Sequence, residues 1–134
     1  MSDNELPNVN SATIERMQLA AKNPNAGPVF MLNLNKYSSS AGFPDGALYK
    51  EYMQSISRLV SEVEGKILWR TTVNGQVVGS QDIDEVLGVW YPSNAAFLNI
   101  RNSPSSARNM ELRERAVKSA NLHWCDPYTV MRNP

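Results

Sequence analysis

Four segments of the chain concentrate apolar residues over lengths that are typical of β-strands. They span about residues 29–36, 66–73, 85–91 and 122–131, and turn-forming residues bound them. The stretch between the second and third segments is long enough to predict an extended hairpin loop. Pro127 lies in the last segment, and because proline cannot donate to a ladder, we expect that strand at an edge of the sheet.

The first of these segments, VFMLNLNK, has two unlike faces, because successive side chains of a strand point in opposite directions. One face is apolar throughout and consists of Phe30, Leu32 and Leu34. The other is apolar at one end and carries amides at the other, and consists of Val29, Met31, Asn33 and Asn35. We expect the first face to pack against helices, and the second face, joined by Trp90, to be left bare by them.

Helical spacing of apolar residues predicts helices before and between the strands. The clearest is an apolar stripe over residues 48–63, for which Gly65 is the predicted C-terminal cap. Two further helices are predicted over about residues 93–100 and 104–119. A short helix capped by Ser11 is predicted before the first strand, and we expect it to be a surface strut or a dimer-contact arm.

The order of the elements is a helix followed by β-α-β-β-α-β, which is the split βαβ arrangement. The sequence therefore predicts an α+β, ferredoxin-like fold with an antiparallel sheet of strand order 4-1-3-2 and an extra N-terminal helix. The helices cover one face of such a sheet, and an apolar second face predicts a second copy of the chain as its cover, giving a dimeric α/β barrel. Residues 1–26 are predicted to form a tail and short helix, and residues 27–134 the ferredoxin-like domain.

The composition excludes several classes of partner. The 134 residues suffice for one domain, and 13 basic and 13 acidic residues give zero net charge, so neither nucleic acid nor a membrane is expected as a partner. A single cysteine, Cys125, excludes an internal disulfide and favours a reducing compartment. Because no apolar run has the length of a membrane span and the polar N-terminus lacks the features of a signal peptide, we expect a cytoplasmic protein.

Several motifs between residues 27 and 119 carry a family resemblance. They are GPVFMLNLNKY (27–37), YKEY (49–52), EGKILWR (64–70), DEVLGVWYPSNAAF (84–97) and NSP (102–104). With these motifs the chain resembles the domain-of-unknown-function family 1330, whose members are small dimeric α/β-barrel proteins. The resemblance implies a ferredoxin-like fold, dimerisation across the open sheet face and a cleft in the barrel, in an architecture similar to that of cofactor-free monooxygenases, isomerases and lyases. The chain departs from the family at Ser105 and Ser106, where an acid and an aromatic residue are usual, and at Trp90, where a basic residue is common.

Three residues are the main candidates for ligand contacts, and we expect them to surround one cavity. Asn33 is an amide in a central strand, where it either orients a ligand or is hydrogen-bonded within the protein. Arg70 offers a planar fork for a carboxylate or phosphate, with an ion pair to a helix acid as the alternative, and Trp90 offers either a stacking wall or dimer packing. Tyr49, at the start of the long helix, is a fourth candidate, whereas Asn35 is expected to be solvated or in a turn.

The only histidine, His123, shares a strand face with Cys125. His123 is a candidate general acid or base because its pKa lies near neutrality, whereas no local motif supports a Cys–His nucleophile. One histidine and one cysteine do not make a metal-binding cluster, so no metal site is predicted, and no motif predicts a cofactor.

Together these features favour a homodimer whose barrel cleft binds a small, partly apolar organic molecule, held by Asn33, Arg70, Trp90 and Tyr49. Such a protein is either a cofactor-independent enzyme in which His123 transfers a proton, or a non-enzymatic carrier or sensor. A structural dimerisation module, in which the protein satisfies all of these polar groups internally, is the third interpretation.

Overall fold

The computed structural model describes residues 8–128. Its strands are β1 (Val29–Tyr37), β2 (Lys66–Thr72), β3 (Glu85–Tyr91) and β4 (Val117–Cys125). Its helices are α1 (Ser11–Ala21), α2 (Ala47–Glu62), α3 (Asn94–Leu98) and α4 (Ser106–Ala116), with short 3-10 helices η1 (Ser39–Ala41) and η2 (Asn99–Asn102). Over this part of the chain, no helix combines the length and the apolar character needed to cross a membrane.

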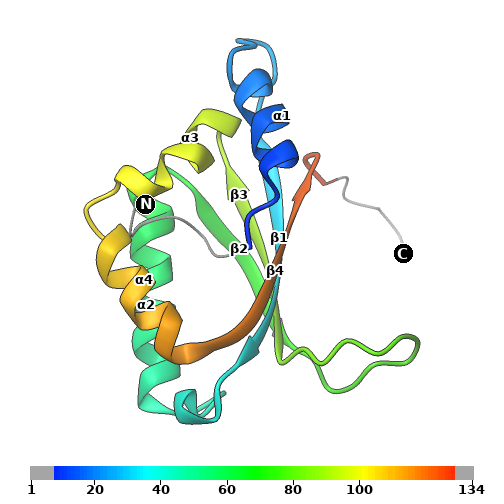
Figure 1. Ribbon diagram of the computed structural model, residues 1–134, viewed down its shortest axis with the longest axis vertical. Helices are drawn as coiled ribbons and strands as arrows, with labels where there is room; N and C mark the ends of the chain where they lie inside the picture. The colour runs from blue at the N-terminus through cyan, green and yellow to red at the C-terminus, as the bar shows by residue number, and fades with distance from the viewer. Residues whose placement is uncertain (1–7, 129–134) are drawn as a thin grey trace.

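The strands form one antiparallel sheet in the order β2-β3-β1-β4, and the helices lie on one side of it (Figure 1). This confirms the predicted α+β class, strand order and ferredoxin-like architecture. Strand β4 is at an edge, as expected, but it ends at Cys125, so Pro127 follows the strand rather than lying within it. The strand also begins directly after α4, at Val117, so the last helix is shorter than predicted; residues 129–131 of the predicted strand lie outside the described residues.

The prediction of which face of β1 packs under the helices is wrong. Val29, Met31 and Tyr37 belong to the core cluster between the sheet and the helices. Phe30 points the other way and contacts Trp69, with ring centroids 6.2 Å apart. The physical reason is that both faces of the strand are apolar enough to be covered, and alternation alone does not determine which one the helices take.

The side of the sheet away from the helices is called the outer face below. By strand register its apolar residues are Phe30, Leu32 and Leu34 of β1, Trp69 of β2, and Val86 and Trp90 of β3. Trp69 remains 44% exposed in the single chain. The outer face is therefore an apolar surface that no helix covers.

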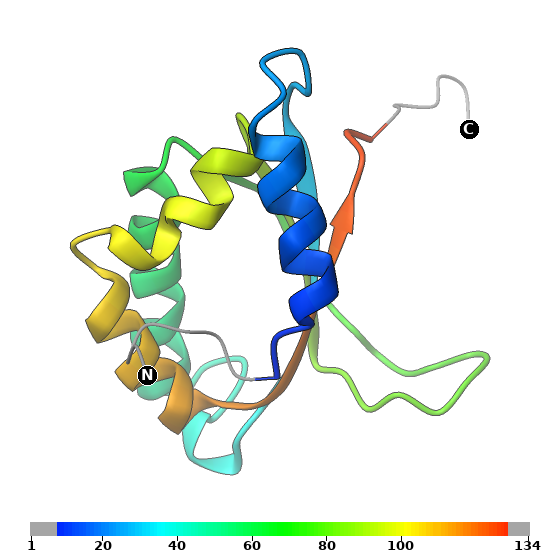
Figure 2. The same cartoon turned by 45° about the horizontal axis from the view of Figure 1, so that its top comes forward.

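Helix α1 lies beside α3 (Figure 2), and its expected role as a surface strut or a dimer-contact arm stays a prediction. Its Met17 is 2% exposed and belongs to the core, and the helix contacts α3. The helix begins at Ser11, which is therefore not its cap; Asn10 is at the N-cap position, and its side chain makes no capping hydrogen bond. Because α1 lies over the sheet, it can form a wall of any space beneath the helices.

Helix α2 carries the predicted apolar stripe, including Tyr52, Leu59 and Val60, which are all buried. Its C-terminal end differs from the prediction. The residue in the left-handed conformation is Glu64, with a φ of 64°, whereas Gly65 closes the turn through its N–H, which donates to the Val60 carbonyl at 2.9 Å.

Residues 73–84 project from the sheet as an arm, on the side away from the helices (Figures 1 and 2). Val77 and Val78 in this arm are 100% and 86% exposed. This confirms the extended hairpin loop predicted between β2 and β3, and it places two large apolar side chains beyond the outer face.

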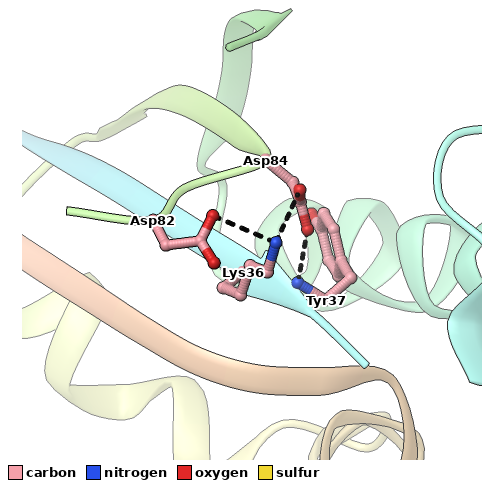
Figure 3. Close-up of polar contacts among 4 residues, drawn as sticks. All are labelled: Lys36, Tyr37, Asp82 and Asp84. Atoms are coloured by element: carbon pink, nitrogen blue, oxygen red, sulfur yellow. Dashed lines mark hydrogen bonds and ion pairs between the residues drawn. The ribbon is translucent and has the colours of Figure 1, made fainter. Parts of the chain in front are cut away.

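The base of the arm is fastened to the end of β1 (Figure 3). Lys36 Nζ lies 3.1 Å from Asp82 Oδ1 and 3.3 Å from Asp84 Oδ1, and the two carboxylates raise the pKa of Lys36 above its usual value. The backbone N–H of Tyr37 donates to Asp84 Oδ2 at 2.9 Å, and the Asp84 N–H donates to the Asn35 carbonyl at 2.8 Å. These contacts fix the backbone on both sides of Lys36.

Candidate functional site

A cavity of about 510 Å³ lies between the sheet and the helices, a size suited to a small organic molecule. All four helices contribute to its wall, as do β1 and β4. Its apolar lining includes Ile14, Ile56, Leu59, Phe97, Leu98 and Leu122. Its polar lining includes Asn33, Asn35, Tyr52, Asn109 and Arg113.

Asn33 projects from the middle of β1, where its neighbours in register are Leu87 of β3 and Leu122 of β4. Its Oδ1 atom is buried and accepts no hydrogen bond within the described part of the chain. Leaving a buried acceptor unpaired costs about 1–3 kcal/mol. The cavity wall therefore contains an acceptor that the surrounding protein does not satisfy.

Arg113 supplies a positive charge to the same cavity from α4. Among residues 8–128, no carboxylate lies within ion-pair distance of its guanidinium. Burial raises the pKa of the nearby Tyr52 hydroxyl, and the adjacent Arg113 partly opposes that rise. A cation without a carboxylate partner at an apolar cavity can receive an acidic group.

A chain of buried hydrogen bonds starts at the cavity and runs away from it. Asn35 Nδ2 donates to Tyr37 Oη at 3.2 Å, and Tyr37 Oη donates to Glu85 Oε1 at 2.6 Å. Tyr49 Oη donates to Glu85 Oε2 at 2.8 Å and accepts from Arg70 Nη1 at 3.1 Å. The carboxylate of Glu85, which is 4% exposed, is thus paired at both oxygens.

The protonation of the two tyrosines in this chain follows from their surroundings. Burial raises the pKa of Tyr37 and of Tyr49, and the hydrogen-bonded Glu85 carboxylate raises both further. Arg70 lowers the pKa of Tyr49, but not enough to reverse the shift. Both hydroxyls therefore keep their protons at neutral pH and act as donors to Glu85.

The predicted site residues lie in three different places. Asn33 lines a cavity, but one that lies under the helices rather than in the predicted barrel cleft on the bare face of the sheet, whereas Arg70 and Tyr49 belong to the buried hydrogen-bond network at Glu85. Trp90 and His123 lie on the outer face, since they pair with Phe30 and Leu32 of β1. The expectation that Asn33, Arg70 and Trp90 surround one cavity is therefore wrong, because Trp90 points to the opposite side of the sheet from the other two.

Several residues of the site were not among the predicted ones. Asn35, expected to be solvated or in a turn, is 4% exposed and belongs to the series of buried hydrogen bonds that ends at Glu85. Arg113 carries a signal that was available in the sequence, because it is a charge at helical spacing between the apolar Met110 and Val117. Glu85 carries no such signal, since an acid at the start of a strand is ordinarily solvated.

The side chains of residues 8–128 contain no group of three or more His, Cys, Asp and Glu residues that could hold a metal ion. The cavity instead contributes amides, a hydroxyl and a guanidinium, which are groups that bind organic ligands by hydrogen bonding.

Comparison with known proteins places the fold but not the activity. No protein-family model matches the chain, and no curated protein matches it. A solved structure of a protein of unknown function from Rhodopseudomonas palustris has 22% sequence identity and a TM-score of 0.73, covering 92% of this chain and 97% of its own. A protein from Arabidopsis thaliana has 12% identity and a TM-score of 0.60, covering 77% and 98%.

A dabb family protein with a ferredoxin-like fold, from Mesorhizobium loti, has 10% identity and a TM-score of 0.52, and the match covers 77% of this chain and 99% of that one. At these identities the likeness concerns the backbone arrangement, since function is carried by individual sites rather than by a fold. The chain therefore has the ferredoxin-like α+β fold of these proteins.

Proposed function

We propose that this protein binds a small, partly apolar organic acid in the cavity between the sheet and the helices. The observation that carries this proposal is the buried, unpaired Oδ1 of Asn33 in the cavity wall. Most buried side-chain acceptors are paired within the protein or by ordered water, so an unpaired one in a cavity wall supports a ligand donor. A ligand donor that reaches Asn33 removes the cost of leaving it unpaired.

The acidic character of the ligand follows from Arg113. A guanidinium that lacks a carboxylate partner binds a carboxylate by charge-assisted hydrogen bonds. The apolar part of the lining, which includes Ile14, Ile56 and Phe97, accommodates the hydrocarbon part of the ligand. His123 does not line this cavity, so the proposal gives it no role in the binding.

The test is a screen of aliphatic and aromatic carboxylic acids, each beside its neutral primary amide, by thermal shift and isothermal titration calorimetry. We expect a subset of the acids to raise the Tm and to bind at least tenfold more tightly than their amides, because only the acids pair with Arg113. The Arg113→Gln variant should lose this preference.

Two variants provide controls. Arg115→Gln removes an exposed arginine of the same helix that does not line the cavity, and it should bind like the original protein. Asn33→Leu should weaken binding while it raises the free energy of unfolding, because it removes an unpaired buried acceptor. Failure of every acid to shift the Tm, together with a destabilised Asn33→Leu variant, would contradict the proposal.

We further infer that the chain is a member of the domain-of-unknown-function family 1330 and that two copies pair through the outer face. The motifs listed above support the family, and the uncovered Leu32, Leu34 and Trp90 support the pairing. The arm, with its exposed Val77 and Val78, stands on the same side and would flank a second copy placed there (Figure 1).

A further inference from the structure

The hydrogen bonds around Glu85 fix the orientation of an amide in the cavity wall. Both oxygens of the Glu85 carboxylate accept, one from Tyr37 and one from Tyr49. A tyrosine hydroxyl has a single proton, so Tyr37, having donated it to Glu85, can only accept from its other neighbour. That neighbour is the amide of Asn35, which must therefore present its nitrogen, and Asn35 Nδ2 lies 3.2 Å from Tyr37 Oη.

This leaves the carbonyl oxygen of Asn35 as the atom that Tyr37 does not use. Asn35 lines the cavity and lies two residues from Asn33 on the same face of β1. Asn33 contributes its own unpaired Oδ1 to that wall. The β1 wall therefore offers the unpaired amide oxygen of Asn33 and, as we infer from the Tyr37 contact, that of Asn35, whereas Arg113 on α4 donates hydrogen bonds.

We propose that the ligand carries a hydrogen-bond donor, an amino or hydroxyl group, in addition to the acid that Arg113 receives, and that Glu85 acts through Tyr37 as the positioning residue that sets this specificity. This rests on the proposed function, because it concerns the same cavity. It names the ligand class more narrowly as amino or hydroxy acids with a partly apolar body.

Backbone contacts around Asn35 also help to hold its side-chain amide in one orientation. Asp84, at the base of the arm, accepts from the Tyr37 N–H (Figure 3). It also donates its own N–H to the Asn35 carbonyl. Asn35 and Glu85 are also direct partners in the β1–β3 register. The amide is therefore held by side-chain and backbone contacts before any ligand arrives, which is the preorganisation that specificity requires.

The experiment uses matched pairs of carboxylic acids that differ only in one group, hydroxyl or amino in one member and methyl in the other, titrated into the protein by calorimetry. We expect the donor-bearing member to bind about tenfold more tightly, because the methyl member cannot donate to the side-chain oxygen of Asn35 that Tyr37 leaves unused. In Glu85→Gln the new side-chain amide can donate to the Tyr37 hydroxyl. Tyr37 can then donate its own proton to the side-chain oxygen of Asn35, so the Asn35 amide is free to turn over. The preference within each pair should then fall to threefold or less.

Tyr49→Phe is the control, since it removes the other donor to Glu85 without touching Asn35, and it should keep the tenfold preference. A general loss of stability would weaken both members of a pair equally, so the ratio reports positioning. If Glu85→Gln does not fold, Tyr37→Phe removes the accepting oxygen and should lose the preference instead. Equal binding of the two members of each pair overturns this inference and leaves the proposed function standing. If no acid binds at all, both are overturned. If the ratio of affinities within a pair stays tenfold in both Glu85→Gln and Tyr37→Phe, the role of Glu85 is overturned.

Discussion

Gly88 of β3 lies opposite Leu32 of β1 on the outer face, where it makes room for a neighbouring ring. A Cβ at this position would clash with the indole ring of Trp69 and would lie 2.8 Å from Phe30 Cζ. The absence of a side chain thus allows Trp69 to lie across the sheet. Gly88 thus leaves the space that the rings of Trp69 and Phe30 occupy on the outer face.

We therefore expect Gly88→Ala to lower the free energy of unfolding by about 1–3 kcal/mol, because Trp69 must leave its position. Chemical denaturation followed by tryptophan fluorescence measures both the loss and the altered ring environment. Gly75→Ala is the matched control, since a Cβ there meets nothing within 4 Å, and its unfolding should be unchanged within about 0.5 kcal/mol. Unchanged stability in Gly88→Ala would show that Trp69 does not rest on Gly88.

At the scale of the elements, the end of α2 determines how β2 enters the sheet. Glu64 takes the left-handed conformation that normally favours glycine. Gly65 is required for a different reason, because a Cβ there would lie 2.8 Å from Val60 Cγ1 and 3.1 Å from the Trp90 carbonyl oxygen. Close packing of the turn against β3 therefore excludes a side chain at Gly65.

The two positions should respond in opposite directions. Glu64→Gly is expected to raise the free energy of unfolding by about 0.5–1 kcal/mol. Glycine removes the steric strain of a side chain in the left-handed backbone conformation, and this gain exceeds the extra conformational entropy that glycine gives the unfolded chain. Gly65→Ala should lower it by about 1–3 kcal/mol through overpacking against Val60. Urea unfolding of both variants provides the measurement, and equal effects of the same sign would refute this account of the turn.

At the scale of the whole molecule, the sheet has one face under the helices and one without cover. The covered face holds the cavity, and the outer face holds aromatic and aliphatic side chains. The arm projects on the side of the outer face (Figures 1 and 2). A two-layer α/β unit with an apolar open face gains most by pairing that face with its own copy. The cavity and the uncovered apolar face thus occupy opposite sides of one sheet.

Sedimentation velocity should therefore give the mass of two chains, and Trp90→Glu should give that of one, because a charge on the outer face would be buried without a partner. Leu19→Glu is the control, since Leu19 on α1 is 67% exposed and lies on the helix side. Circular dichroism should show both variants folded. A single-chain mass for the original protein at high concentration would rule out the pairing.

The sequence by itself determined the order and type of the elements, because periods of two and of 3.6 residues are properties of neighbouring positions. The β-α-β-β-α-β order then restricted the sheet to the observed strand order. The position of Asn33 in a central apolar strand marked it as a candidate, although for a cleft on the opposite face of the sheet. Arg113 could have been found in the same way, as a charge on an apolar helical stripe.

Only the tertiary structure decided which face of the sheet lies under the helices and where the cavity is. Two faces of similar apolar character leave that choice to the packing of all the helices, including α1, against the sheet. The hydrogen bonds that orient Asn35 join β1 to a carboxylate on β3 about fifty positions later in the chain, and such a pairing exists only once the register is formed. Contacts between distant residues, rather than local patterns, therefore make the site.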